Sequence, residues 1–235
     1  MPDDSAAAGR RDVGVVIVAG GAGTRAGGAE LKQFRWVAGR PMLLHSVQAF
    51  QARPDVAMVV VVLPREHVGD PPVWLFQSDL ERLLVSVGGR ERADSVRNGL
   101  EDLPPECAIV VVHDAARPLV PDGVIDRVIG EARRGHGAIA ALPVVDTLKE
   151  VDDDGRIART VERARLWRAQ TPQAFPREMI FRAHRDGRGV AATDDAALCE
   201  RLGLPVVVVK GSERAMKVTD ESDFARAEAL YMLRE

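Results

Sequence analysis

Cysteine and lysine are scarce in this chain of 235 residues. The two cysteines, Cys107 and Cys199, are too few for a disulfide framework and lack the spacing of zinc ligands. Their scarcity excludes a disulfide-stapled secreted protein and fits a reducing compartment. Only four of the 32 basic residues are lysines, which leaves 28 arginines, so each retained lysine is informative.

The chain also lacks a large excess of charge and any long apolar run. Its formal net charge of -3 argues against a nucleic-acid or acidic-membrane partner. The longest apolar runs, such as 56–63, are far shorter than the roughly 20 residues of a membrane-spanning helix. Residues 1–12 lack the apolar core of a secretory signal, so we expect a disordered tail on a cytoplasmic protein. A hydrophobic content of 46% excludes wholesale disorder.

Short apolar runs alternate with amphipathic stretches along most of the chain. β-Branched runs predict buried strands, and stretches with a helical period predict helices. Strands are expected at 13–19, 56–63, 85–87, 109–113, 138–142 and 206–209. Helices are expected at 41–52, 74–84, 91–100, 121–134, 176–185, 193–202 and 221–233. This order predicts an α/β fold, with a mostly parallel sheet and helices on both faces, in a single domain spanning residues 1–235.

The alternation breaks at residues 144–161, which we call the arm. This segment is typical of a β-hairpin with an Asp-Gly turn at 152–155. It carries charge and little apolar mass, and an isolated hairpin of this kind is marginally stable. We therefore expect a protruding arm that packs against another subunit; the alternative is a solvated surface flap.

A glycine-rich segment, 19–25, follows the first expected strand. Glycines let the backbone approach a ligand, and successive amides there can bind an anion. The segment is not a Walker loop, because it ends in Gly-Thr-Arg rather than Gly-Lys-Ser or Gly-Lys-Thr. A dinucleotide site is disfavoured as well, because the acidic residue that it needs after the second strand is missing. Two nearby cations, Arg25 and Lys32, suit a triphosphate. The alternative is a tight turn without a ligand.

Two further segments carry candidate polar residues. Asp114 follows the third clear strand, at the edge where open α/β sheets place ligands, and it could bind Mg²⁺ together with phosphates. The alternative is that Asp114 caps the next helix. A Gly-Gly turn at 88–89 precedes Ser95, whose hydroxyl could bind a base or face solvent. Among 28 arginines, Arg163 does not stand out, whereas Lys32 and Lys217 are candidate functional residues.

Seven motifs, in this order, resemble the 2-C-methyl-D-erythritol 4-phosphate cytidylyltransferase family: AGGAGTR with the following KQF, GGRERADSV, VHDAARP, PVVDTLKEV, LWRAQTPQAF, ATDDAA and MKVT. The resemblance implies a Rossmann-like nucleotidyltransferase fold. It implies transfer of CMP from CTP, with Mg²⁺ as cofactor, onto a sugar-alcohol phosphate of the isoprenoid precursor pathway, releasing diphosphate. It also implies a homodimer with exchanged arms, and no nucleic-acid or membrane partner.

The resemblance also implies the residues of the site. The implied catalytic residues are Arg25, Lys32, Arg163 and Lys217. The implied CTP-binding residues are Ala19, Gly20, Gly21, Gly23, Gly89, Asp94, Ser95 and Ala115. The implied substrate-binding residues are Arg117, Thr147 and Thr171, and the implied metal ligand is Asp114. The chain departs from the family at three places: it has Val18-Ala19-Gly20-Gly21 where the family usually has Pro-Ala-Ala-Gly, Leu31 before Lys32, and Ala215-Met216 before Lys217.

Three alternative functions stay open at this stage. Ribitol 5-phosphate cytidylyltransferases look similar through the first two motifs, although HDAARP and the DTLK segment at 146–149 fit the methylerythritol enzyme better. A sugar-phosphate nucleotidyltransferase that uses UTP, GTP or dTTP is the second alternative. A nucleotide-binding regulator without turnover is the third, and diphosphate release would exclude it.

Overall fold

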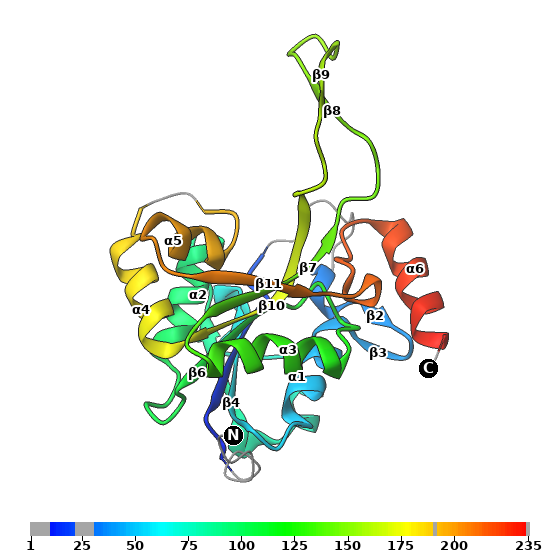
Figure 1. Ribbon diagram of the computed structural model, residues 1–235. Coiled ribbons are helices and arrows are strands. Elements are labelled where there is room, and N and C mark those ends of the chain that lie inside the picture. Colours follow the sequence, from blue (N-terminus) through cyan, green and yellow to red (C-terminus); the bar gives the residue numbers. More distant parts are fainter. Residues whose placement is uncertain (1–9, 22–30, 190–191, 234–235) are drawn as a thin grey trace.

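A seven-stranded sheet forms the centre of the computed structural model, which describes residues 10–21, 31–189 and 192–233 (Figure 1). The strands lie in the order β11-β7-β10-β6-β1-β4-β5. Neighbouring strands are parallel except where β10 runs antiparallel to β6 and β7. The strand bounds are β1 Val13–Val18, β4 Val56–Leu63, β5 Leu83–Val87, β6 Ile109–Asp114, β7 Gly137–Pro143, β10 Trp167–Pro176 and β11 Val206–Lys210.

The central strands are apolar on both faces because helices cover both. On β1, Val15 and Ile17 pack in one apolar cluster with α1 (Met42–Gln51) and α3 (Asp122–Arg133). Val16 points to the opposite cluster, with α2 (Arg92–Glu101), α4 (Arg177–Asp186) and α5 (Asp195–Arg201). A strand buried on both sides reads as a continuous apolar run rather than an alternating one. The predicted mostly parallel sheet with helices on both faces is confirmed.

A third apolar cluster joins the last helix to a small hairpin. In it, Phe224 of α6 (Glu221–Met232) packs with Val37, from the hairpin of β2 (Trp36–Val37) and β3 (Arg40–Pro41). Five single-turn helices complete the described elements: η3 Lys32–Phe34, η4 Arg65–His67, η5 Val73–Gln77, η6 Leu80–Arg82 and η7 Glu213–Ala215. Within the described ranges, every helix is too short or too polar to cross a bilayer.

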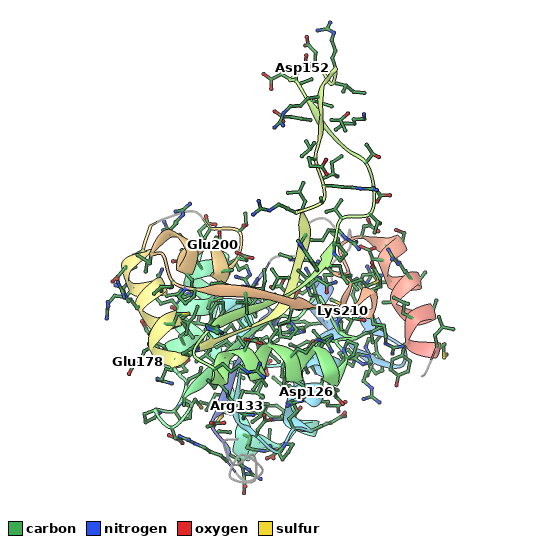
Figure 2. The ribbon with its side chains drawn as sticks, viewed as in Figure 1. Asp126, Arg133, Asp152, Glu178, Glu200 and Lys210 are labelled. Carbon is green, nitrogen blue, oxygen red and sulfur yellow. The ribbon has the colours of Figure 1, made fainter. Side chains whose placement is uncertain are left out.

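The arm stands away from the body as a two-stranded hairpin of β8 (Leu148–Val151) and β9 (Ile157–Val161) (Figure 1). The Asp-Gly turn is present: the Asp152 carboxylate accepts from the amides of Asp154 and Arg156, at 3.1 and 2.8 Å. Asp152 lies at the tip, and the side chains along both strands extend into the space around them (Figure 2). Val151 and Ile157 are 53% and 65% exposed, so the arm lacks a core of its own within this chain.

The structure differs from the local predictions at four places. Residues 74–84 are not one helix but two short 3-10 helices, and β5 begins two residues earlier than expected, at Leu83. The strand β10 was not predicted at all. The predicted tail, 1–12, falls mostly outside the described residues, but Asp12 is already part of the packed body. Its carboxylate pairs with Arg133 at 3.0 Å, and its carbonyl accepts from the amide of Ile109.

Candidate functional site

A cavity of about 540 Å³ lies at the carboxyl ends of β1, β5 and β6. The chain moves outward from β1 through α1 to β4 and β5, and then returns through α2 to β6 on the other side of β1. Such a reversal leaves a crevice at the strand ends, where open α/β sheets bind ligands. Among the described residues, four cations and two carboxylates line the cavity: Lys32, Arg90, Arg92, Lys217, Glu91 and Asp114.

Two glycine turns form one wall of this cavity because their backbones approach closely. A Cβ built on Gly88 would lie 3.3 Å from Cα of Gly20, and one on Gly89 would lie 2.2 Å from Cβ of Asp94. The Ser95 hydroxyl holds the second turn by accepting from the Gly89 amide at 3.0 Å. The glycines at this wall therefore leave backbone, rather than side chains, facing the ligand space.

Asp114, the last residue of β6, lies at the centre of a cluster of cations. Lys217 Nζ donates to its Oδ2 at 2.9 Å, and Arg92 Nε donates to its Oδ1 at 3.2 Å. Arg117 Nε lies 3.9 Å from Oδ2. Burial alone would raise the pKa of Asp114, but the attraction of Arg92, Lys217 and Arg117 outweighs it and holds that pKa far below its ordinary value. Asp114 is therefore ionised at any physiological pH.

A smaller cavity of about 200 Å³ adjoins the first, and the two share Arg92, Asp114 and Lys217. Its other lining residues come from β10, from the segment just before α5 and from the loop after β6, and they include Thr171, Thr193 and Arg117. Because three charged residues stand at the junction, a group in one cavity and a group in the other would both face Asp114 and its partners.

The hydrogen bonds of Thr171 fix what its hydroxyl can offer. His113 Nε2 lies 3.1 Å from the Arg117 carbonyl, which only accepts, so Nε2 carries the proton. Burial lowers the pKa of His113 to about 4, so the ring is neutral near pH 7 and its Nδ1 is an acceptor. Thr171 therefore donates to Nδ1 at 3.1 Å, while accepting from the Asp114 amide at 3.0 Å. Toward a ligand, this hydroxyl can only accept.

The two candidate lysines both line the larger cavity but differ in their anchors. Lys32, on η3, donates from Nζ to the Val218 carbonyl at 2.8 Å. Lys217 pairs with Asp114 while its side chain stays 47% exposed. Gln33, next to Lys32, donates to the carbonyls of Ala19 and Gly21 at 2.6 and 3.2 Å, which ties η3 to the first glycine turn.

The structure brings most of the predicted site residues together. Those that line the larger cavity are Ala19, Gly20, Gly21, Lys32, Gly89, Ser95, Asp114, Ala115 and Lys217. Arg117 and Thr171 line the smaller one. Gly23 and Arg25 lie outside the described residues.

Three predicted residues are elsewhere. Asp94 does not line either cavity: it forms a capping box at the start of α2 with Glu91 and pairs with Arg97 at 2.9 Å. Thr147 and Arg163 are exposed on and beside the arm, apart from both cavities of their own chain. Arg163 donates there to the Val145 carbonyl.

Sequence reasoning missed Arg92 and Thr193. Arg92 belongs to the GGRERADSV motif, but a chain with 28 arginines gives no signal that marks one of them. Thr193 belongs to ATDDAA and precedes the N-cap of α5, Asp194, so its polar neighbours read as an ordinary helix start. Only the fold brings both to the junction of the cavities.

The described residues contain no group of three or more His, Cys, Asp or Glu side chains placed to hold a metal ion. A Mg²⁺ ion usually keeps several waters and takes one or two carboxylates together with substrate phosphates, so it needs no such group. Asp114 fits as that single protein ligand, because it is ionised and borders both cavities.

Comparisons with known proteins agree on one family. The sequence model of 2-C-methyl-D-erythritol 4-phosphate cytidylyltransferase (IspD) matches residues 13–234. A protein of that name from Syntrophus aciditrophicus (strain SB) is 41% identical over 229 residues, which cover 94% of this chain and 96% of the relative. One from Streptomyces coelicolor is 45% identical over 232 residues, which cover 93% and 84%. The crystal structure of the Thermus thermophilus protein superposes with a TM-score of 0.78 at 36% identity, covering 94% of this chain and 100% of that one. This chain therefore belongs to the 2-C-methyl-D-erythritol 4-phosphate cytidylyltransferase (IspD) family.

Proposed function

We propose that this protein transfers CMP from CTP to 2-C-methyl-D-erythritol 4-phosphate. The products are 4-diphosphocytidyl-2-C-methyl-D-erythritol and diphosphate, in the non-mevalonate isoprenoid precursor pathway. The observation that carries the proposal is the paired cavity at the strand ends, with its glycine wall and its cluster of cations around Asp114, in a member of this family. The names of the relatives favour methylerythritol phosphate over ribitol 5-phosphate as the acceptor.

The reaction needs cations more than it needs a base. An oxygen of the acceptor phosphate attacks the α-phosphorus of CTP, the bond from that phosphorus to the bridging oxygen breaks, and diphosphate leaves with the electron pair. The acceptor phosphate is already an anion, so no proton has to be removed. The difficulty is to bring two polyanions together, and fixed cations lower that barrier.

The larger cavity suits CTP. Its glycine turns would offer backbone amides to the phosphates, while Gly89 and Ser95, which line the same cavity, would bind the base. Lys32, with the sequence-predicted Arg25, would stabilise negative charge on the reacting phosphates. Lys217 at the junction would position the acceptor phosphate against the α-phosphate.

The smaller cavity suits the acceptor. Arg117 and Thr171 line it, and the Thr171 hydroxyl can accept but not donate. It would therefore bind a hydroxyl of the sugar alcohol rather than the phosphate. A divalent cation such as Mg²⁺, held by Asp114 and the nucleotide phosphates, would supply further charge neutralisation at the triphosphate.

The arm would complete the acceptor site of a second subunit, in a homodimer with exchanged arms. The family resemblance implies substrate contacts for Thr147 and Arg163, yet in their own chain they lie away from both cavities. Ordering a free flap costs roughly 1–2 kcal/mol per residue, so a flap that bound a phosphate alone would gain little. Contacts between subunits, using exposed residues such as Val151 and Ile157, would offset that cost.

Subunit mixing tests the exchanged arm. Lys32→Ala and Arg163→Ala proteins are each expected to be inactive, but a hybrid of the two has one site with both defects and one site with neither. Activity should therefore return on mixing. A mixture of Lys32→Ala with Lys217→Ala is the matched control, because both residues belong to the body of the same chain and every hybrid site keeps a defect. If hybrids form and the first mixture stays inactive, the arm acts within its own chain.

Diphosphate release across a panel of nucleotides and acceptors tests the function. We expect release with CTP and 2-C-methyl-D-erythritol 4-phosphate, and at least tenfold less with ribitol 5-phosphate or with UTP, GTP or dTTP. Preference for ribitol 5-phosphate would reassign the acceptor, and the absence of release with every pair would indicate a nucleotide-binding regulator. We place the reaction in the cytoplasm, where the two buried free thiols fit a reducing environment.

A further inference from the structure

A buried hydrogen-bonded pair of side chains lies behind the junction of the two cavities. His184 of α4 and Asp195 of α5 are each 1% exposed, and His184 Nε2 donates to Asp195 Oδ1 at 2.9 Å. The other carboxylate oxygen, Oδ2, accepts from Arg92 Nη1 at 2.8 Å. Neither His184 nor Asp195 lines either cavity, so neither can touch a substrate.

Arg92 connects this pair to the site. While Nη1 faces Asp195, Nε donates to Asp114 Oδ1, so two carboxylates hold two edges of one guanidinium. Burial alone would lower the pKa of Arg92, but Asp195 and then Asp114 raise it above its ordinary value. The planar fork of an arginine loses its orientational freedom when two of its edges are bound in this way.

The two carboxylates that bind Arg92 have different neighbours. Besides Arg92, Asp114 has the cations Lys217 and Arg117 as neighbours, whereas Asp195 has the hydrogen bond from His184. Without Asp195, Asp114 would be the only carboxylate paired with Arg92 in the described part of the chain. Arg92 could then turn about its bond to Asp114 and compete with Lys217 for that carboxylate.

We propose that Asp195 is a positioning residue for the transfer reaction, a role that rests on the function proposed above. It holds the Arg92 guanidinium so that Arg92 binds Oδ1 of Asp114 and leaves Oδ2 to Lys217 and to the ligand space. His184 supports Asp195 from the α4 side. These contacts of His184 and Asp195 thus link the packing of α4 and α5 to the orientation of the charged groups at the junction.

Asp195→Asn is the direct test, with diphosphate release as the assay. The amide keeps one acceptor oxygen for Arg92 but loses the negative charge, so the charge-assisted hydrogen bond that holds the guanidinium becomes weaker. We expect kcat to fall about 10²-fold, because displacement of a reacting group by about 1 Å has this effect. The KM for CTP should stay within twofold, because the glycine wall that binds the nucleotide is untouched. An unchanged kcat would overturn the proposal.

Two comparisons separate positioning from a structural role. Asp195→Glu keeps the charge but adds volume in a packed interior. If Asp195 positions Arg92 through its charge, Asp195→Glu should be more active than Asp195→Asn. If its role is purely structural, Asp195→Glu should be less active than Asp195→Asn. Asp55→Asn is the matched control: it removes a carboxylate that is paired with Arg53 and Arg133, and it does not line either cavity. It should lower the melting temperature about as much as Asp195→Asn but leave kcat unchanged.

A double-mutant cycle and a spectroscopic signal complete the test. If Asp195 acts through Arg92, adding Asp195→Asn to Arg92→Lys should change kcat less than twofold, whereas independent effects would multiply and overturn the proposal. The ¹⁵Nε–H signal of Arg92, identified by its loss in Arg92→Lys, should be slow to exchange in the native protein and fast in Asp195→Asn. This signal needs no turnover: if it is unchanged, the positioning role fails. If it changes while the native protein releases no diphosphate, only the proposed function fails.

Discussion

The stability of this protein should fall steeply between pH 7.5 and pH 5, because of His113. The ring is fully buried, and burial lowers its pKa from 6.5 to about 4. In this interval the unfolded chain binds a proton at His113 and the native state does not, so stability declines as the pH falls from 6.5 toward 4. With these two pKa values, His113 alone should cost about 2 kcal/mol of unfolding free energy at pH 5 relative to pH 7.5.

Urea unfolding at pH 7.5, 6.5, 5.5 and 5.0, followed by circular dichroism, measures the effect. His113→Gln offers an amide donor for the Arg117 carbonyl and an acceptor for Thr171, so it is the variant to compare. It should lose about 2 kcal/mol less than the native protein over this interval. His45 is also buried with a lowered pKa, but it contributes equally to both proteins and cancels in the comparison.

A surface variant, His136→Gln, serves as the matched control and should retain the full loss on acidification. The same loss in His113→Gln as in the native protein would show that burial does not lower the pKa of His113. The ring would then gain a proton between pH 7.5 and pH 5, and the assignment of Thr171 as an acceptor only would hold only at the upper end of this interval, where Nδ1 is bare.

Three further predictions concern the site and the packing. Asp114→Asn should lower kcat about 10²-fold and shift the Mg²⁺ titration to higher concentration, and an unchanged titration would argue against Asp114 as a metal ligand. Lys32→Arg should lower kcat about 10²–10³-fold with little change in KM for CTP or in melting temperature. The reason is that a guanidinium cannot replace the compact ammonium bound to the Val218 carbonyl. A near-normal kcat would contradict this prediction. Gly99→Ala should destabilise the fold by about 1–3 kcal/mol, because its Cβ would lie 2.6 Å from Val16 Cγ1. Gly130→Ala, with open space around it, should be neutral or stabilise the fold by about 0.5–1 kcal/mol. Equal melting temperatures of the two variants would count against this packing.

Apolar runs were enough to predict the strands that lie inside the sheet, with one exception. The runs at 56–63 and 109–113 correspond to β4 and β6 because buried β-branched residues leave few alternatives. The exception is β10, whose middle contains Gln170, Thr171, Pro172 and Gln173. Polar residues and a proline argue against a central strand, and the pairing with β7 is indeed irregular between Ala169 and Gln173. These same polar side chains face the smaller cavity, so the feature that hid the strand belongs to the site.

The candidate site was predicted where a residue type carries a local signal. Glycine turns, a strand-end aspartate and rare lysines all have one, and Gly20, Asp114, Lys32 and Lys217 do line the larger cavity. A polar residue at the start of a helix can either cap the helix or bind a ligand, and the sequence does not separate these roles. Asp94 belongs to the capping box of α2. The pairing of Arg92 with Asp195 joins residues 103 positions apart, which no local pattern can indicate.

Backbone carbonyls, rather than side chains, anchor several polar groups around the two cavities. Lys32 donates to the carbonyl of Val218, Arg117 to that of Ala215 at 2.7 Å, and Gln33 to that of Ala19. A carbonyl is present whatever residue occupies the position. The chain can therefore exchange the side chains at 215 and 218 without losing these anchors, provided that the replacements fit the apolar packing in which both residues are fully buried. The departure of Ala215 from the family pattern is a change of this kind.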